Sequence, residues 1–399
     1  MSGWRGIWTP ARARLWLVAG VVAAYLPVVG MPFRGWLDFS AFYAAGSLAF
    51  TAALPRLDAI VAFQRDHGLP ITPFVYPSAV ALPYAPLSAL PYGVAAALHV
   101  GLMLGVLVLA ARLGADLLGL PRRWVILGAL AWGPAAAGVV SGQNTSIALF
   151  LAVLAAKAMV DRRQVMAGAL VGILAYKPQL AAPLIGLGAL RGWWRGSVAV
   201  VIAVAVWYAL GVVATGGNTA WYRDWFDTLS SYSAADFREN GWQAISLPAL
   251  GTRLELVTGI PWLTLVGYVG GGLIVLACIP QMRCLPTVDS IALACACGLV
   301  VSPHAWVYDA TLLLPALGVL AARANRRAWP WRDRWLFAAM FMVGLTWPLG
   351  GVVGLTLVPV LVVAIPLLLR QAVAGDPQPA AGGATTGRAT AVGSLPFGQ

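Results

Sequence analysis

Charged residues are scarce in this chain. Only 10% of its 399 residues are charged, whereas 60% are hydrophobic and the mean hydropathy is +0.81. A soluble domain does not bury so large an apolar share, so the composition excludes a soluble protein and indicates a polytopic membrane protein. The net charge of +12 would suggest nucleic acid in a soluble chain, but here the arginines stand in short loops between apolar segments, which is a topology signal. We therefore expect no nucleic-acid partner.

Several signatures of metal and nucleophile chemistry are also missing. The sequence contains no P-loop, no Gly-x-Ser-x-Gly nucleophile motif and no metal-ligand cluster of histidines and cysteines. Asp38, the acid that follows the first apolar segment, has no Asp-x-Asp companion. Four cysteines lie in or beside late apolar segments, where thiols usually behave as small apolar groups: Cys278, Cys284, Cys295 and Cys297. The sequence predicts neither a metal nor a cofactor.

The apolar runs predict an all-α polytopic membrane protein with about 12 membrane segments, some of them short or broken. The runs fall near residues 13–31, 92–111, 123–140, 144–160, 164–176, 178–190, 197–214, 262–280, 288–301, 305–322, 335–349 and 352–369. Two long loops, 32–91 and 215–261, contain aromatic residues and short apolar runs, which predicts helices lying along the interface. Residues 1–374 thus form one membrane domain, and 375–399 a disordered cytoplasmic tail.

The arginines indicate an orientation. With both termini in the cytoplasm, 19 of the 26 basic residues lie inside and six outside, and Lys177 stands at a turn. A single tilted helix over 164–190 would instead put Arg191 and Arg195 outside, so the count favours two short helices that break at Lys177-Pro178. The basic N-terminus followed by an apolar run is interpreted as a retained first span, because many spans follow. These features predict a multi-pass membrane protein, and we expect it in the bacterial inner membrane.

Two charged residues stand out by their position. Asp38 lies where the first span reaches the far side of the membrane, and a carboxylate at a water–lipid boundary stays ionised at little cost. Lys177 is one of two lysines in the chain, and an ammonium in an apolar stretch is a functional candidate because its desolvation is expensive. The alternative for Lys177 is a side chain that reaches the interface without further function.

Other polar and aromatic residues are expected at the same outer level. They are Gln143 and Asn144, Gln179, Trp242 and Gln243, and His304 and Asp309. Gln143 and Asn144 have an ordinary alternative, since Gly-Gln-Asn is good turn chemistry. Asp309 lies in an apolar run and needs a partner, such as His304 or a ligand. The other histidines, His67 and His99, are expected to be incidental.

Five motifs occur in a fixed order along the chain. They are Asp38-Phe39-Ser40-Ala41-Phe42-Tyr43-Ala44-Ala45-Gly46, Phe74-Val75-Tyr76-Pro77-Ser78, Gly142-Gln143-Asn144, Tyr176-Lys177-Pro178-Gln179 and Ser302-Pro303. From about residue 36 to 320 the chain therefore resembles glycosyltransferase family 87, the polyprenol-phosphate-mannose-dependent mannosyltransferase-like proteins of the GT-C superfamily. Mannosyltransferase members often have a His pair where Tyr308-Asp309 stand here, which leaves the sugar open.

The resemblance implies a helical GT-C fold and a function. A sugar, mannose being one candidate, would move from a polyprenyl-phosphate donor to a glycolipid or glycan acceptor on the outer face, among membrane lipids. It also implies that Asp38 is the catalytic base, which accepts the proton of the acceptor hydroxyl. Lys177 and His304 would stabilise the departing phosphate. One displacement would invert the anomeric centre, and phosphate leaves without protonation, so no second carboxylic acid is needed.

The remaining candidates are assigned to the sugar and the acceptor. Tyr76, Trp242 and Trp306 have rings that stack on sugar faces, although such rings more commonly anchor a protein at the interface. The polar candidates for sugar or acceptor contact are Gln143, Asn144, Gln179, Gln243 and Asp309. Two other functions stay open: a transporter or flippase for lipid-linked sugars, and a membrane scaffold without activity.

Overall fold

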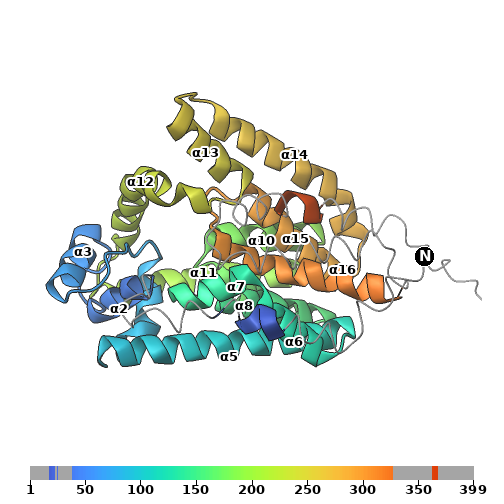
Figure 1. The fold of residues 1–399 in the computed structure, drawn as a ribbon, viewed down its shortest axis with the longest axis horizontal. Coiled ribbons are helices and arrows are strands. Elements are labelled where there is room, and N and C mark those ends of the chain that lie inside the picture. Colours follow the sequence, from blue (N-terminus) through green and yellow to red (C-terminus); the bar gives the residue numbers. More distant parts are fainter. Residues whose placement is uncertain (1–17, 23–24, 26–37, 327–361, 367–399) are drawn as a thin grey trace, which may run out of the picture.

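The structure is a computed structural model, which describes residues 18–22, 25, 38–326 and 362–366 (Figure 1). Most of these residues are helical, and their only β-type pairing is one isolated antiparallel bridge between Ala244 and Trp306. The all-α prediction is therefore confirmed for this part of the chain. The expected first span, the two expected spans after residue 326 and the disordered tail lie essentially outside the described residues, so the division at residue 374 stays a prediction.

The helices from Phe39 to Arg326 follow one another with short connections. Their bounds are α2 Phe39–Ser47, α3 Leu57–Asp66, η2 Ser78–Tyr84, α4 Ala85–Ser88, α5 Tyr92–Leu118, α6 Arg122–Ala131, α7 Gly133–Ser141, α8 Thr145–Val160, α9 Gln164–Leu174, α10 Pro178–Leu190, α11 Trp194–Ala214, α12 Trp221–Asn240, η3 Gly241–Gln243, α13 Leu247–Thr258, α14 Leu263–Cys284, α15 Thr287–Val301, η4 Val307–Leu313 and α16 Leu314–Arg326.

Nine of the predicted membrane segments fall within the described residues, and each of them is helical. Three helices, α5, α11 and α14, are long and apolar enough to cross a membrane, and α6 with α7 makes a fourth candidate that is bent by 63°. The apolar helices α8, α9, α10 and α15 are shorter. The chain is thus a helical membrane protein with three or four such candidates in the described part, and the predicted count of about 12 is not confirmed.

Proline fixes the break that the sequence predicted in the middle of the chain. Helix α9 ends at Leu174, and α10 begins at Pro178 with Lys177 as its N-cap residue. Proline is favourable at the first position of a helix and disrupts one that tries to pass through it. Because α9 and α10 have 11 and 13 residues, they are only about 17 and 20 Å long. The predicted break into two short helices is confirmed.

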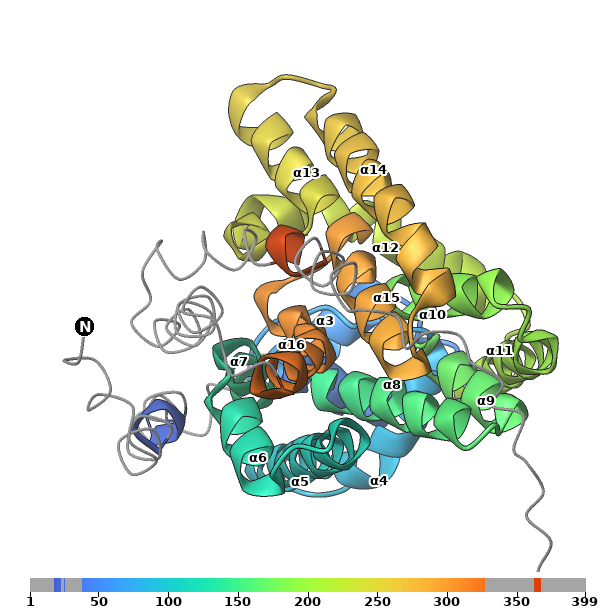
Figure 2. The same cartoon turned by 90° about the vertical axis from the view of Figure 1, so that its right-hand side faces the viewer.

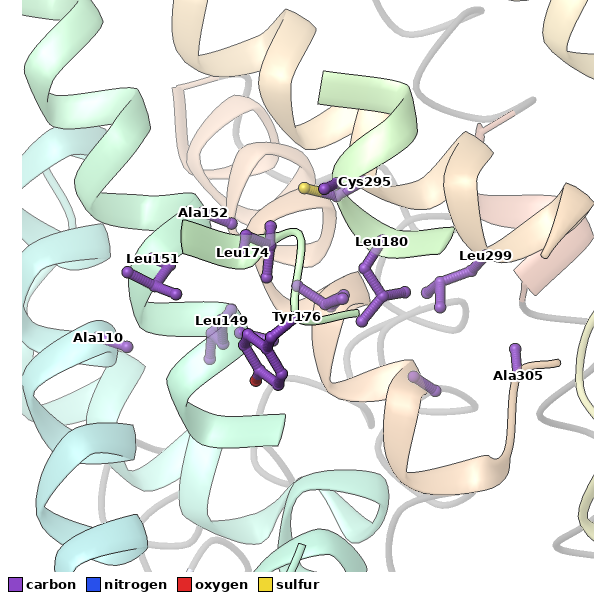
Figure 3. Close-up of a cluster of buried hydrophobic side chains, with 14 of the residues drawn as sticks. Ala110, Leu149, Leu151, Ala152, Leu174, Tyr176, Leu180, Cys295, Leu299 and Ala305 are labelled. Carbon is purple, nitrogen blue, oxygen red and sulfur yellow. The ribbon is translucent and has the colours of Figure 1, made fainter. Parts of the chain in front are cut away.

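Small residues let the helices pack closely around an alanine- and leucine-rich core. In the crossing of α9 and α11, a Cβ on Gly168 would collide with the backbone carbonyl of Gly196. The cluster in Figure 3 includes Leu149 and Leu151 of α8, Leu174 and Leu180, all of them buried. Helices α13 and α14 form a hairpin that projects from the rest of the bundle (Figures 1 and 2).

Arginine side chains join the helices at one end of the bundle by hydrogen bonds and an ion pair. The guanidinium of Arg191, which follows α10, donates to the carbonyls of Met282, Arg283 and Leu285 and to the Ser290 hydroxyl. On the neighbouring helices, Arg323 pairs with Asp289. Lys177 precedes α10 and Arg191 follows it, so the arginine-rich end and the Lys177 end are separated by the length of α10.

At the Lys177 end, the two long loops fold into helices that contact each other. Trp225 of α12 donates its indole N–H to the carbonyl of Val75, and the Thr228 hydroxyl donates to that of Pro55. The helices expected in both loops are therefore present. The first loop is also tied to the end of α11, because the amide of Phe50 donates to the carbonyl of Ala214.

Candidate active site

Asp38 stands at the N-cap position of α2, but its carboxylate does not cap this helix. The side chain instead lies beside the polar side chains of Gln143 and Ser141, and the Asp38 backbone amide donates to the carbonyl of Ser141 at 3.0 Å. Burial raises the pKa of the Asp38 carboxyl to about 6, while these polar neighbours and the nearby charge of Lys177 act in the opposite direction. A carboxylate with such a pKa is suited to proton transfer near neutral pH.

The segment that faces Asp38 is held by its own backbone. Gly142 ends α7 in the left-handed region at φ +79°, where Gly142 and Gln143 donate to the carbonyls of Val139 and Gly138. A Cβ on Gly142 would lie 2.7 Å from the Cβ of Phe39, so glycine is needed for this close approach. The sequence alternative for Gln143, a turn position, is therefore correct for the backbone, although its side chain faces Asp38.

His99 fixes the same segment from the opposite side. It lies in α5 and is 1% exposed, and its Nε2 lies 2.9 Å from the carbonyl oxygen of Gly142. The His99 ring stacks on Phe39, with 5.0 Å between the ring centroids. His99 therefore has a structural place beside the site, because it contacts both the residue after Asp38 and the glycine that faces it; that it is incidental to the chemistry stays a prediction. His67 is exposed and hydrogen-bonds within its own helix turn.

Lys177 and Asp309 form a buried ion pair. The Lys177 Nζ lies 3.1 Å from Asp309 Oδ1, and the two side chains are 4% and 3% exposed. Asp309 Oδ2 accepts the backbone N–H of Trp306, which holds the carboxylate in place. The ammonium also lies 5.8 Å from the ring centre of Tyr76 and 5.5 Å from that of Tyr308. Asp309 needed a partner on sequence grounds, and that partner is Lys177 rather than His304.

His304 pairs with a carboxylate that the sequence analysis missed. Its Nε2 lies 3.5 Å from Asp236 Oδ2, and Asp236 is buried in α12. Asp236 also accepts from Tyr232 Oη at 3.2 Å and from Asn240 Nδ2 at 2.7 Å. Burial lowers the pKa of His304, and the carboxylates of Asp236 and Asp309 act in the opposite direction. A sequence signal existed, since Tyr232 and Asn240 stand four residues on either side of Asp236, on one face of the helix.

Two of the aromatic candidates have clear positions. The ring of Trp306 is 4% exposed and packs against His304 and Phe237, with ring centroids 4.5 and 5.1 Å away. Trp306 therefore supports His304 and does not present a free ring face. Trp242 in η3 is 44% exposed, at the end of α12.

The polar candidates divide into cluster members and neighbours. Tyr76 donates to Gln143, which places both of them beside Asp38. Asn144 is 2% exposed, and its backbone carbonyl accepts the Tyr176 hydroxyl. Gln179 and Gln243 are partly buried, and within the described residues no side-chain hydrogen bond joins either of them to these residues. The structure thus brings Asp38, Tyr76, Gln143, Lys177, His304 and Asp309 into one electrostatically coupled group, which also includes Asp236.

This fold and this cluster define a class of protein: a helical membrane protein with buried acid, base and aromatic groups gathered at one end of its bundle. The model of glycosyltransferase family 87 matches residues 74–303, more than half of the chain. The chain belongs to glycosyltransferase family 87 and is a membrane glycosyltransferase. Tyr76, Gln143, Lys177 and Asp236 lie within the matched residues, while Asp38, His304 and Asp309 flank them. No curated protein and no solved structure shows significant similarity to the chain.

Proposed function

We propose that this glycosyltransferase transfers a sugar, with mannose as the first to test, from a polyprenyl-phosphate donor to a glycolipid or glycan acceptor on the outer face of the bacterial inner membrane. Asp38 is the general base of the reaction. The observation that carries the proposal is geometric: Gln143, which lies beside Asp38, contacts Tyr76 and Tyr308, and the rings of these two tyrosines lie 5.8 and 5.5 Å from the buried Lys177 ammonium. The pKa of the Asp38 carboxyl, which burial raises to about 6, supports it. Asp38 can then receive a proton while Lys177 faces the phosphate that departs.

The short helices support a lipid-borne donor. Since α9 and α10 are about 17 and 20 Å long and a hydrocarbon layer is about 30 Å thick, their junction at Lys177 lies below the membrane surface if their other ends lie at the opposite one. The phosphate of a polyprenyl lipid reaches that depth from within the membrane. An ammonium has three N–H donors, and Asp309 takes one of them, so a phosphate oxygen can bind beside the carboxylate.

The arginines support the orientation. The bundle end locked by Arg191 is rich in residues that the positive-inside pattern assigns to the cytoplasm, and Lys177 lies at the opposite end of α10. The proposed reaction therefore takes place on the outer side. His304 contributes a second contact to the donor phosphate, and inversion follows from a single displacement by the acceptor hydroxyl, whose proton passes to Asp38.

The test compares Asp38→Asn with Asp58→Asn in membranes supplied with polyprenyl-phosphate mannose and an acceptor extract. Asp58 is a matched control, since its side chain is 68% exposed and pairs with Arg56 on the surface. We expect Asp38→Asn to lower transfer at least a hundredfold, roughly the lower bound for losing a general base, and Asp58→Asn to leave it unchanged. Retained transfer by Asp38→Asn would overturn the assignment of the base. Movement of the lipid-linked sugar without a new glycosidic bond would favour a flippase.

Stability gives the internal control for this experiment. The Asp38 pKa is raised on folding, so its contribution to stability is fully present below the unfolded pKa of 3.8 and is lost as the pH rises through about 6. At pH 8 the folded protein therefore holds a carboxylate that costs on the order of 3 kcal/mol. Asparagine removes that charge, so the melting temperature of Asp38→Asn at about pH 8 should equal or exceed that of the unmodified protein. Lost transfer then reports chemistry and not unfolding.

A further inference from the structure

The side-chain amide of Gln143 has a fixed orientation. Gln143 is 6% exposed, and its Oε1 accepts the Tyr76 hydroxyl at 2.7 Å. Its Nε2 lies on the other side of the amide, where it donates to the hydroxyl of Tyr308 at 3.4 Å, and the side chain lies close enough to Asp38 to lower the pKa of that carboxyl. The reverse orientation would set the amide oxygen toward the Asp38 carboxylate, and two acceptors that face each other repel.

The backbone holds this amide in register with Asp38. Gly142 carries Gln143 out of α7, the Asp38 amide donates to the carbonyl of Ser141, and His99 binds the carbonyl of Gly142. The two hydrogen bonds join the start of α2, the end of α7 and the buried face of α5. Both involve the backbone carbonyls of residues 141 and 142, so the backbones of Gln143 and Asp38 are held close together.

We propose that Gln143 is a positioning residue for Asp38: Tyr76 holds the Gln143 side chain beside the carboxylate, and the amide N–H group donates to it during the reaction. This inference rests on the proposed role of Asp38 as the general base. A donor to a carboxylate stabilises the ionised form over the acid, so Gln143 keeps the base ready to accept a proton and aims its second oxygen at the acceptor. Gln143 then has a role other than binding the sugar.

The surroundings of Asp38 make this donor important. The titratable groups that interact with Asp38 from the neighbouring elements are Lys177, Asp236, Tyr76, Tyr92, Tyr232 and Tyr308. Lys177 is the cation in this set and is shared with Asp309, while the charge of Asp236 opposes ionisation of Asp38. Burial already raises the Asp38 pKa to about 6, so losing the amide donor raises it further, into the working range of the enzyme.

The test measures kcat/KM against pH, from about pH 5 to 9, for four forms of the full chain in detergent or membranes. They are the unmodified protein, Gln143→Leu, Tyr76→Phe and the control Tyr43→Phe. The ring of Tyr43 lies 6.2 Å from that of Phe39, the residue after Asp38, but the Tyr43 hydroxyl donates to the carbonyl of Leu90. In the unmodified protein we expect the acid limb, where protonation of Asp38 lowers kcat/KM, near pH 6.

We expect Gln143→Leu to move this limb upward by about one pH unit, a tenfold loss at low pH that nearly disappears at high pH. Tyr76→Phe frees the amide to turn and moves the limb by a smaller amount, and Tyr43→Phe leaves it in place. Gln143→Glu is nearly isosteric and serves if the leucine variant does not fold. It sets a second carboxylate beside Asp38 and moves the limb upward as well.

Other outcomes overturn the inference. A sugar ligand would raise KM equally at every pH, and a purely structural residue would lower the folded fraction without moving the limb. If Asp38→Asn is inactive and neither Gln143 variant shifts the limb, the inference fails while the proposed function stands. If Asp38→Asn retains transfer, the proposed function itself fails.

Discussion

Lys177 and Asp309 neutralise each other, so at the residue scale their roles in folding and in phosphate binding must be separated. A buried ion pair that loses one partner leaves an uncompensated charge, which costs about 3–5 kcal/mol, whereas replacing both partners by apolar residues is often neutral. We expect Lys177→Met and Asp309→Leu to unfold at clearly lower temperatures, and the double variant to recover most of the loss. Thermal unfolding in detergent measures all three.

Transfer by the double variant then addresses the phosphate contact. If Lys177 binds the donor phosphate, the double variant is folded but inactive, because no ammonium faces the leaving group. Wild-type transfer by a stable double variant would exclude that contact. The control is Lys157→Met, since the Lys157–Asp161 pair is 40% and 34% exposed and such a pair contributes only about 0–1 kcal/mol.

The residues that sequence reasoning found share one property, which is rarity. Asp38 and Lys177 are isolated charges next to apolar segments, and the cost of desolvation singles them out. Partners were not accessible in this way, because Lys177 meets Asp309 across 132 positions of sequence. Asp236 lies in an amphipathic helix among other acids, and only its burial and its contact with His304 distinguish it.

At the element scale, prolines predicted one break and explain another. Pro178 indicated the end of the helix before it, and α9 and α10 do separate there. The bend of 63° between α6 and α7 was not predicted, although Gly133-Pro134 is a clear signal for it, with Pro134 in the first turn of α7. The sequence prediction for this segment used only the length of its apolar run, and that length contains no information about a bend.

The crossing of α9 and α11 gives a prediction at the same scale. Gly168→Ala places a methyl group against the backbone of Gly196, which cannot move without separating the helices. We expect a loss of about 1–3 kcal/mol, typical of an overfilled contact, and a lower melting temperature. Gly186→Ala is the matched control, since a Cβ at Gly186 in α10 meets nothing within 4 Å. Equal melting temperatures for the two variants would contradict the close packing.

For the whole molecule, composition established the class because no soluble fold buries 60% hydrophobic residues. The number of spans did not follow, because a run of 11 to 16 apolar residues is too short to decide between crossing and ending inside the bundle. The Asp38 cluster is assembled by α2, α7, α10, α12 and η4, and its position depends on how all of them pack (Figures 1 and 2).

The orientation of the whole molecule is the property on which the outer-face reaction depends, and it can be measured in the full chain. After replacing the native cysteines by serine, single cysteines are placed as Arg195→Cys, in the first turn of α11, and as Arg238→Cys in α12; both positions are exposed. We expect a membrane-impermeant maleimide to label Arg238→Cys in intact spheroplasts, and Arg195→Cys only after permeabilisation, because the positive-inside pattern puts residue 195 in the cytoplasm. Labelling of residue 195 from outside would reverse the arginine argument, and with it the side on which Asp38 and Lys177 meet the donor.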